Sequence, residues 1–194
     1  KFKNQKDVKK DIELLSSQVA RCNEILKRLT LNPVEEDNFI DNDLTMKDYL
    51  RQITSSFKEI SKKSFVLNFN QDSNEKRITK SIEIVYGLRN FIGNANKFAK
   101  NTIFISLKSD SEITQITIED DGDGYPRDVL SKIGEPYLKS NDTKDKSKSG
   151  LGLGLFIGKT LLEKNFASIN CRNSKTRSGA EVIIKWNNKD LFNI

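Results

Sequence analysis

The chain has 194 residues, of which 36% are hydrophobic and 31% charged, so it can bury one core of about 150 residues with an appendage. No apolar run approaches the roughly 18 residues of a membrane span, and no secretory signal pattern begins the sequence. The net charge of +6 invites a nucleic-acid partner, but lysines and acids are interspersed, which argues against one. Two distant cysteines without any histidine argue against a zinc site and fit a reducing, cytoplasmic compartment.

The first predicted element is a helix over residues 7–31 with a narrow apolar seam. Its seam residues alternate at steps of four and three, and they are Val8, Ile12, Leu15, Val19, Cys22, Leu26 and Leu29. This heptad spacing keeps a seam against a partner helix, whereas a helix that lies on its own domain normally has a wider stripe. The pattern therefore favours an intermolecular bundle, as in a homodimer. Asn32-Pro33 ends the helix, because proline excludes the residue before it from the helical region, and a polar linker follows over residues 34–44.

Residues 45–194 are predicted to form one compact domain. The expected helices span 45–60, 79–100 and 153–164, and the expected strands span 65–69, 103–107, 116–118, 168–172 and 180–186. In the strands, isoleucine and leucine at every second position would face one side of a sheet. The pattern predicts an α+β sandwich with helices on one face of a mixed sheet.

The helix predicted over residues 79–100 carries a polar stripe. Asn90, Asn94 and Lys97 recur at steps of four and three, so they share one helical face. Asparagine oxygens can ligate a hard cation such as Mg²⁺, and a lysine can neutralise phosphate oxygens. A solvated helix face explains the same stripe when it is taken alone.

An acidic, glycine-containing turn follows the strand predicted around residues 116–118. Asp120 would be fixed at the strand end, where its carboxylate can accept a hydrogen bond from an exocyclic amine such as that of adenine. Gly122 and Gly124 permit backbone conformations closed to other residues and let a ligand ring approach the main chain. In isolation, a plain Asp-Gly turn is the simpler interpretation.

A polar segment and a glycine-rich segment come next. Residues 140–149 contain no apolar side chain and cannot offset the entropy of their own ordering, so we expect a lid that closes over a nucleotide. Gly150-Leu-Gly152-Leu153-Gly154 then opens a helix, and alternate glycines expose successive backbone N–H groups to an anion. A Walker A loop would need glycine in place of Leu153, and a dinucleotide fingerprint would need glycine in place of Ile157, so both are excluded.

The order of these four segments resembles a known family. The asparagine helix, Asp-x-Gly-x-Gly, the segment Gly134-Glu-Pro-Tyr137 and Gly-x-Gly-x-Gly are similar to the N, G1, F and G2 boxes that unite histidine kinases with Hsp90, MutL and the type II topoisomerases. The resemblance spans about residues 48–185 and implies a Bergerat-type ATP-binding fold. The heptad helix resembles the second helix of a histidine kinase dimerisation hairpin. Gln18-Val-Ala-Arg-Cys22, with Gly134–Tyr137, is similar to the redox-responsive RegB/PrrB subfamily.

The resemblance implies roles for individual residues in an ATP pocket. Asn94 would hold Mg²⁺, Asn90 and Lys97 would face the phosphates, and Asp120 would bind the adenine amine. Phe98 stands where tyrosine is common in the family, which removes a hydroxyl near the nucleotide. The residues expected to bind nucleotide are Asn90, Asn94, Lys97, Phe98, Asp120, Gly122, Gly124, Tyr137, Lys139, Gly150, Gly152, Leu153 and Gly154.

One departure from the family is large, because histidine kinases transfer the γ-phosphoryl group to a histidine and this sequence has none. The chain begins at Lys1 rather than methionine, so we expect the acceptor helix to precede it in a longer, membrane-anchored protein that signals to a response regulator. The chain is then predicted to bind Mg-ATP as the catalytic portion of the kinase without phosphorylating itself. Two alternatives stay open: another ATPase of the superfamily, which would lack the heptad helix, and a non-catalytic, nucleotide-regulated dimerisation or docking module.

The two cysteines have different expected roles. Cys22 occupies an a position of the heptad, so in a symmetric dimer it could form a disulfide with its counterpart if the Cα atoms lie within about 7 Å. The alternative is that Cys22 is a small buried hydrophobic side chain. The resemblance to a redox-responsive subfamily makes the disulfide and the buried side chain about equally well supported. Cys171, on a predicted strand, is expected in the core.

Overall fold

The computed structural model describes residues 43–70, 77–79, 81–138 and 152–192. They belong to one compact unit, Asn42–Ile194. The other unit, Lys1–Asp41, lies outside the described residues, and with it lie the predicted heptad helix, Cys22 and most of the predicted linker. Lys139 and Gly150 also lie outside the described residues.

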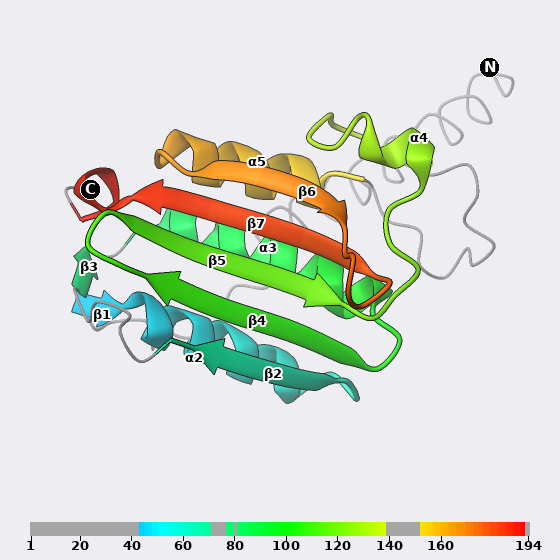
Figure 1. The fold of residues 1–194 in the computed structure, drawn as a ribbon, viewed down its shortest axis with the longest axis horizontal. Coiled ribbons are helices and arrows are strands. Elements are labelled where there is room, and N and C mark those ends of the chain that lie inside the picture. The colour runs from blue at the N-terminus through cyan, green and yellow to red at the C-terminus, as the bar shows by residue number, and fades with distance from the viewer. Residues whose placement is uncertain (1–42, 71–76, 80, 139–151, 193–194) are drawn as a thin grey trace, which may run out of the picture. The chain divides into compact units, whose positions relative to one another are not determined.

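A five-stranded mixed sheet forms the centre of the unit, in the order β2-β4-β5-β7-β6 (Figure 1). Its strands are β2 (Ser64–Phe69), β4 (Thr102–Ser109), β5 (Ile113–Asp120), β6 (Ser168–Asn173) and β7 (Ala180–Asn187). β2 runs parallel to β4, and the other neighbouring strands are antiparallel. The predicted α+β class with a mixed sheet is confirmed.

Three helices cover one face of this sheet (Figure 1). They are α2 (Met46–Lys58), α3 (Ile82–Phe98) and α5 (Gly154–Lys164). The sequence pattern did not predict four short elements, which are β1 (Asp43–Thr45), β3 (Arg77–Thr79), α4 (Arg127–Leu130) and α6 (Asn188–Leu191). Within the described ranges, no helix combines the length and apolar character needed to cross a membrane.

The helix predicted over residues 79–100 is shorter at both ends. Thr79 belongs to β3, which pairs with β1, and α3 begins only after Ser81. The Ser81 hydroxyl accepts a hydrogen bond from the Ile84 N–H at 3.3 Å, which satisfies one of the amides that have no partner within the helix. This cap fixes the start of α3.

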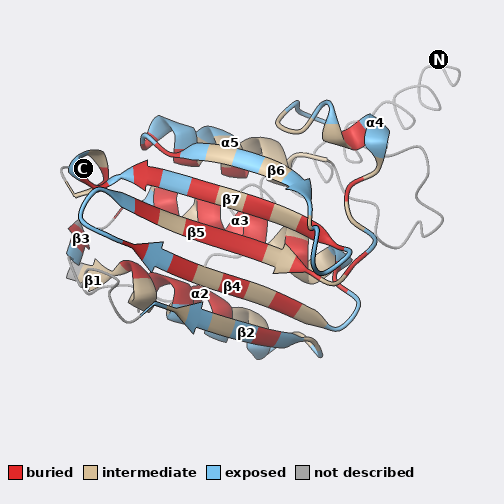
Figure 2. Cartoon of the chain, in the orientation of Figure 1, coloured by how far each residue is buried: buried red, intermediate tan, exposed pale blue. Residues whose placement is uncertain are grey.

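Alternation along the strands separates a core face from an open face (Figure 2). Ile103, Ile105, Ile116 and Ile118 are each at most 1% exposed and pack toward the helices, as predicted. Their strand neighbours are turned to the opposite side, which carries polar and charged side chains, among them Gln115 and Glu119 of β5. We call that side of the sheet the open face.

Two glycines allow α3 and α5 to pack closely. A Cβ on Gly87 would lie 2.5 Å from Cγ of Leu162, and a Cβ on Gly158 would lie 3.2 Å from the carbonyl oxygen of Gly87. A Cβ on Gly158 would also lie 3.1 Å from Cβ of Asn90. This close approach brings the polar stripe of α3 against the first turns of α5.

Candidate functional site

Asp120 is a buried carboxylate at the end of β5, as the sequence predicted. Its side chain is 3% exposed, and Oδ1 accepts hydrogen bonds from the N–H groups of Gly122 at 2.8 Å and Ala180 at 3.2 Å. Among the described residues, both hydrogen bonds to this carboxylate end on Oδ1. Oδ2 therefore retains its capacity to accept a hydrogen bond from a ligand.

The electrostatics of Asp120 also favour a hydrogen-bond donor from a ligand on Oδ2. Burial raises the pKa of Asp120, and the nearby charge of Asp121 adds to this rise, while the Gly122 and Ala180 amides and the Lys63 ammonium oppose it. A raised pKa means that the ionised form is poorly solvated in the folded protein. An additional donor on Oδ2 would stabilise that form, which is a property of binding-site carboxylates.

Glycines surround this carboxylate because no side chain fits beside it. A Cβ on Gly122 would lie 2.5 Å from the carbonyl oxygen of Phe98, and Gly124 adopts a φ of +77° that favours glycine. Gly179, which sequence reasoning missed, is buried, and a Cβ there would lie 2.0 Å from the carbonyl oxygen of Asp120. The main chain at Gly122 and Gly179 thus packs against Asp120, and the end of α3 packs against Gly122.

The far side of the turn is held by Asn173, the last residue of β6. Its Oδ1 accepts a hydrogen bond from the Tyr125 N–H at 2.6 Å, and its Nδ2 donates to the Tyr125 carbonyl oxygen at 3.0 Å. Sequence reasoning missed this residue as well, since an asparagine at a strand end is an ordinary turn residue. The paired bonds fix the backbone that follows Gly124.

Cys171 lies beside the same turn but is not in the core as predicted. It is half-buried, because β6 is the edge strand of the sheet. Its thiol is hydrogen-bonded to the Tyr125 hydroxyl, and burial raises the pKa of Cys171 to about 11. Lys159 and the bond to Tyr125 act in the opposite direction. The thiol is consequently protonated at neutral pH and a poor nucleophile.

The polar stripe of α3 is only partly solvated. Asn90 is 5% exposed, and its Nδ2 donates to the Tyr86 carbonyl oxygen at 2.8 Å, so a solvated face does not explain this residue. Asn94 and Lys97 are half-buried, and Nζ of Lys97 lies 5.1 Å from the ring centroid of Phe98. A Cβ on Gly154 would lie 3.6 Å from Oδ1 of Asn90, which places this oxygen at the start of α5.

The C-terminal end of α3 is capped by a lysine from another segment. Nζ of Lys63 donates to the carbonyl oxygen of Ala99 at 2.6 Å, to that of Lys97 at 3.4 Å and also to that of Asn96. A cation is favourable at a helix C-terminus, where carbonyl oxygens have no partner within the helix. Lys63 therefore fixes the end of the helix next to the Asp120 turn, and nothing in its local sequence distinguishes it from a solvated lysine.

The start of α5 is shaped by Gly152 and Leu153. Gly152 has a φ of +69°, and its carbonyl oxygen accepts a hydrogen bond from the Leu138 N–H at 3.2 Å. Leu153 is the N-cap of α5, and its side chain cannot accept a hydrogen bond from the first helical amides, which stay available to an anion. Tyr137 has a φ of 61° and is 66% exposed.

Many of the described residues predicted for the pocket lie on the C-terminal half of α3 or in segments next to it. Asn90 contacts the start of α5, and the Phe98 carbonyl lies against Gly122, so the helix connects the glycine-rich segment to the Asp120 turn. In the described part of the chain, no three His, Cys, Asp or Glu side chains gather as ligands for a metal ion. A cation at this site would depend on amide oxygens such as those of Asn90 and Asn94 and on oxygens of a ligand.

Residues 79–190 match the family model described as histidine kinase-, DNA gyrase B-, and HSP90-like ATPase. The chain belongs to this family. It is 30% identical to the sensor histidine kinase RegB of Cereibacter sphaeroides over 200 residues, which cover 94% of this chain and 43% of RegB. It is 29% identical to the sensor protein RstB of Escherichia coli over 99 residues, 51% of this chain and 23% of RstB. The chain therefore spans less than half the length of these relatives.

Solved structures show the same fold. The mycobacterial sensor histidine kinase MprB has a TM-score of 0.61 and 16% identity over 75% of this chain and 95% of that one. Full-length ShkA in complex with AMPPNP has a TM-score of 0.62 and 19% identity over 74% of this chain and 30% of that one. These structures show the fold, and the family match at residues 79–190 lies within the unit Asn42–Ile194. The predicted likeness to RegB is confirmed.

Proposed function

We propose that this chain is the ATP-binding catalytic portion of a two-component sensor histidine kinase, and that it donates the γ-phosphoryl group to a histidine outside this sequence. The observation that carries the proposal is Asp120, a buried carboxylate with one oxygen held by two backbone amides, which leaves the other oxygen to accept a hydrogen bond from a ligand. The 6-amino group of adenine supplies the donor that this oxygen requires. Family membership gives the class of nucleotide.

The triphosphate would extend along α3 from the Asp120 turn toward the start of α5. The backbone amides of Leu153 and Gly154 would receive phosphate oxygens, because a helix N-terminus attracts anions. Lys97, half-buried on the same face of α3, would supply a positive charge. Gly122 and Gly124 would let the adenine ring lie against the main chain, and Tyr137, Lys139 and Gly150 remain proposed contacts at the edge of the pocket.

The residues present fit a magnesium ion that is shared with the nucleotide. Nδ2 of Asn90 is held by Tyr86, so the oxygen of this amide is fixed in direction, and Asn94 lies one helical turn further on. Mg²⁺ retains several waters and is also coordinated by substrate phosphates, so one or two amide oxygens of the protein suffice to hold it. We assign Asn94 as its ligand. When bound, the ion would neutralise charge on the phosphates.

The wider biology of the chain is proposed from its resemblance to sensor kinases. A homodimer would form through the heptad helix, and a response regulator would take the phosphoryl group from the histidine. The full-length protein would be anchored in a membrane with this portion in the cytoplasm. Redox control through Cys22 belongs to the same proposal and stays open between a switch and a buried thiol.

Nucleotide binding tests the proposal directly. Calorimetry with ATP and excess Mg²⁺ should show one site per chain in the parent, and Asp120→Asn should bind ATP at least about tenfold more weakly, because an amide N–H₂ then faces the adenine amine. Incubation with γ-labelled ATP should leave no stable phosphate on the chain, since it has no histidine. Undiminished binding by Asp120→Asn, or a stable label on the parent, contradicts the proposal. A parent that forms dimers but does not bind ATP would indicate a docking module instead.

A further inference from the structure

The connection between β6 and β7 folds back onto the turn that carries Asp120. Residues 174–179 form this connection and are called the hairpin loop. The Ser174 N–H donates to the Gly179 carbonyl oxygen at 2.8 Å, which closes the loop. Asn173, just before the loop, holds Tyr125, and Ala180, just after it, donates to Asp120. The two ends of the hairpin loop therefore bracket the turn of residues 121–124.

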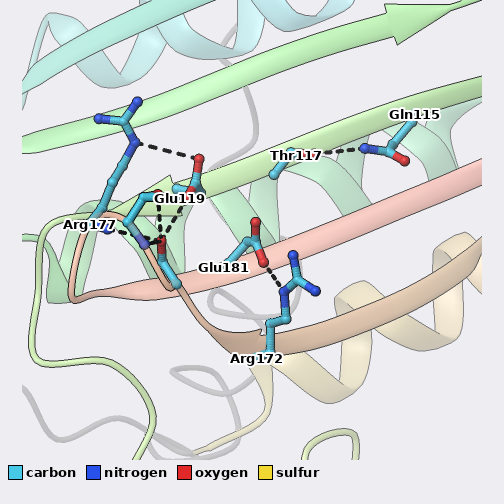
Figure 3. Close-up of polar contacts among 8 residues, drawn as sticks. Gln115, Thr117, Glu119, Arg172, Arg177 and Glu181 are labelled. Carbon is cyan, nitrogen blue, oxygen red and sulfur yellow. Dashed lines mark hydrogen bonds and ion pairs between the residues drawn. The ribbon is translucent and has the colours of Figure 1, made fainter.

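Glu119 anchors the hairpin loop from the open face of the sheet. Successive side chains of a strand point to opposite faces, so Glu119 is turned away from the pocket that Asp120 lines. Its Oε1 accepts a hydrogen bond from the Ser174 hydroxyl at 2.8 Å, and its Oε2 lies 3.5 Å from Nε of Arg177 (Figure 3). The Glu119 side chain is 18% exposed, which limits competition from water.

Arg177 fastens the same loop through a second contact. Its guanidinium carbon lies 3.6 Å from the ring centroid of Phe104, the residue opposite Glu119 on β4. A guanidinium over an aromatic face gains a cation–π attraction in addition to its ion pair. Within the loop, the hydroxyl oxygen of Ser174 accepts hydrogen bonds from the N–H groups of Thr176 at 3.2 Å and Arg177 at 3.1 Å. Glu119 and Arg177 therefore hold the loop against the open face of the sheet.

A neighbouring ion pair leaves Glu119 able to bind the hairpin loop. Glu181 of β7 is opposite Glu119 in the register, so the two carboxylates are neighbours on one face. Glu181 pairs with Arg172 of β6, as Figure 3 shows, and Glu119 pairs with Arg177. Each carboxylate thus has its own arginine, which offsets the repulsion expected between like charges on adjacent strands.

We propose that Glu119 and Arg177 are positioning residues that set the base specificity of the nucleotide site. The inference rests on the proposed function, in which Asp120 receives the 6-amino group of adenine. Anchored by Glu119, the loop keeps the Ala180 N–H on Oδ1 of Asp120 and so reserves Oδ2 for the base. Without the anchor, Gly179 and Ala180 move away from Asp120 and its carboxylate rotates. The site then distinguishes a 6-amino purine from a 6-oxo purine less well.

The test compares ATP with inosine triphosphate, which carries an oxygen in place of the 6-amino group. Calorimetry on the full 194-residue chain with excess Mg²⁺ gives both affinities for the parent, Glu119→Ala, Glu119→Gln and Arg177→Ala. Gln115→Ala is the matched control, because Gln115 lies on the same strand and the same face and is hydrogen-bonded to Thr117 at 3.2 Å. Figure 3 shows it away from the hairpin loop.

The expected result is a change in preference rather than a general loss. Glu119→Ala should weaken ATP binding by about tenfold and leave inosine triphosphate within about twofold of the parent, since one charge-assisted contact is lost. Arg177→Ala should act in the same direction. Glu119→Gln retains an acceptor for Ser174 and should fall between parent and Glu119→Ala. Gln115→Ala should keep the parent preference.

Each contrary outcome has a separate meaning. A parent that binds both nucleotides equally contradicts the adenine role of Asp120 and therefore the proposed function. A parent that prefers ATP, with Glu119→Ala and Arg177→Ala that prefer it just as strongly, overturns the positioning role alone. Equal losses for both nucleotides indicate a merely structural role and also overturn it. Circular dichroism reports folding, and Arg177, on an exposed loop, carries the test if Glu119→Ala unfolds.

Discussion

At the scale of single residues, Asp120 shows how a binding site can oppose stability. Its pKa is raised in the folded chain, so its ionised form is disfavoured there relative to the unfolded chain. The raised pKa contributes to the free energy of unfolding in full below the ordinary carboxyl pKa. This contribution is lost as the pH rises through the raised pKa of Asp120. At neutral pH, the fold therefore carries the cost of a poorly solvated charge.

Asp120→Asn should consequently fold at least as stably as the parent at pH 7. The amide oxygen still accepts the bonds from Gly122 and Ala180, and the buried charge is gone. Thermal unfolding at pH 7 should give a Tm equal to or above that of the parent, and the difference should shrink as the pH approaches 4. A clearly lower Tm at pH 7 would show that the carboxylate charge stabilises the fold.

Cys171 gives a second prediction at this scale. In a Cys22→Ser variant it is the one remaining thiol, and its pKa of about 11 lies above the ordinary value of 9.0. At pH 8 the folded chain should react with iodoacetamide about a hundredfold more slowly than the chain in urea, because the thiolate is the reactive form. Equal rates in the folded and unfolded chains would contradict the shift, and a variant without both cysteines gives the background.

At the scale of elements, the contact between α3 and α5 determines the shape of the pocket. The alternation of the strands, the burial of one sheet face and the position of Asp120 at a strand end follow from the local sequence. Asn173, Gly179 and Glu119 could not be assigned in this way. Their roles arise from contacts between distant segments: Tyr125 and Asn173 are 48 residues apart, and Asp120 and Ala180 are 60 apart.

Gly158→Ala should test the helix contact. The new Cβ would lie 3.0 Å from Cε2 of Phe91 and 3.1 Å from Cβ of Asn90, so α3 must give way by a few tenths of an ångström. We expect a loss of about 1–3 kcal/mol in the free energy of unfolding, as for other overpacked cores, together with weaker ATP binding. Urea denaturation and calorimetry measure the two effects.

Gly93→Ala, on α3, is the control. Its Cβ would approach Cζ of Phe57 at 3.4 Å, an ordinary contact, and alanine is the better helix former by about 0.5–1 kcal/mol. This variant should be as stable as the parent or more stable. If both substitutions change stability by the same amount, close packing at Gly158 is not the cause.

At the scale of the whole molecule, the site residues and the heptad helix belong to different units. The described residues that we assign to ATP lie within Asn42–Ile194, whereas the predicted dimerisation helix lies in Lys1–Asp41. A chain of residues 42–194 should therefore bind ATP with the affinity of the parent, within about twofold, and should be monomeric. Calorimetry and light scattering on both chains provide the comparison. A large loss of affinity on deletion would mean that the first unit contributes to the pocket.

The contact between Leu138 and Gly152 has a practical consequence. The two residues are joined by a backbone hydrogen bond, and a Cβ on Gly152 would lie 2.2 Å from the Leu138 carbonyl oxygen, so the two ends of the connection between them meet. The entropy of closing a loop between two such ends grows only with the logarithm of the loop's length. Foreign sequence, such as a fluorescent reporter, can therefore be spliced in between these residues without displacing α5. The position offers an attachment point for an ATP biosensor.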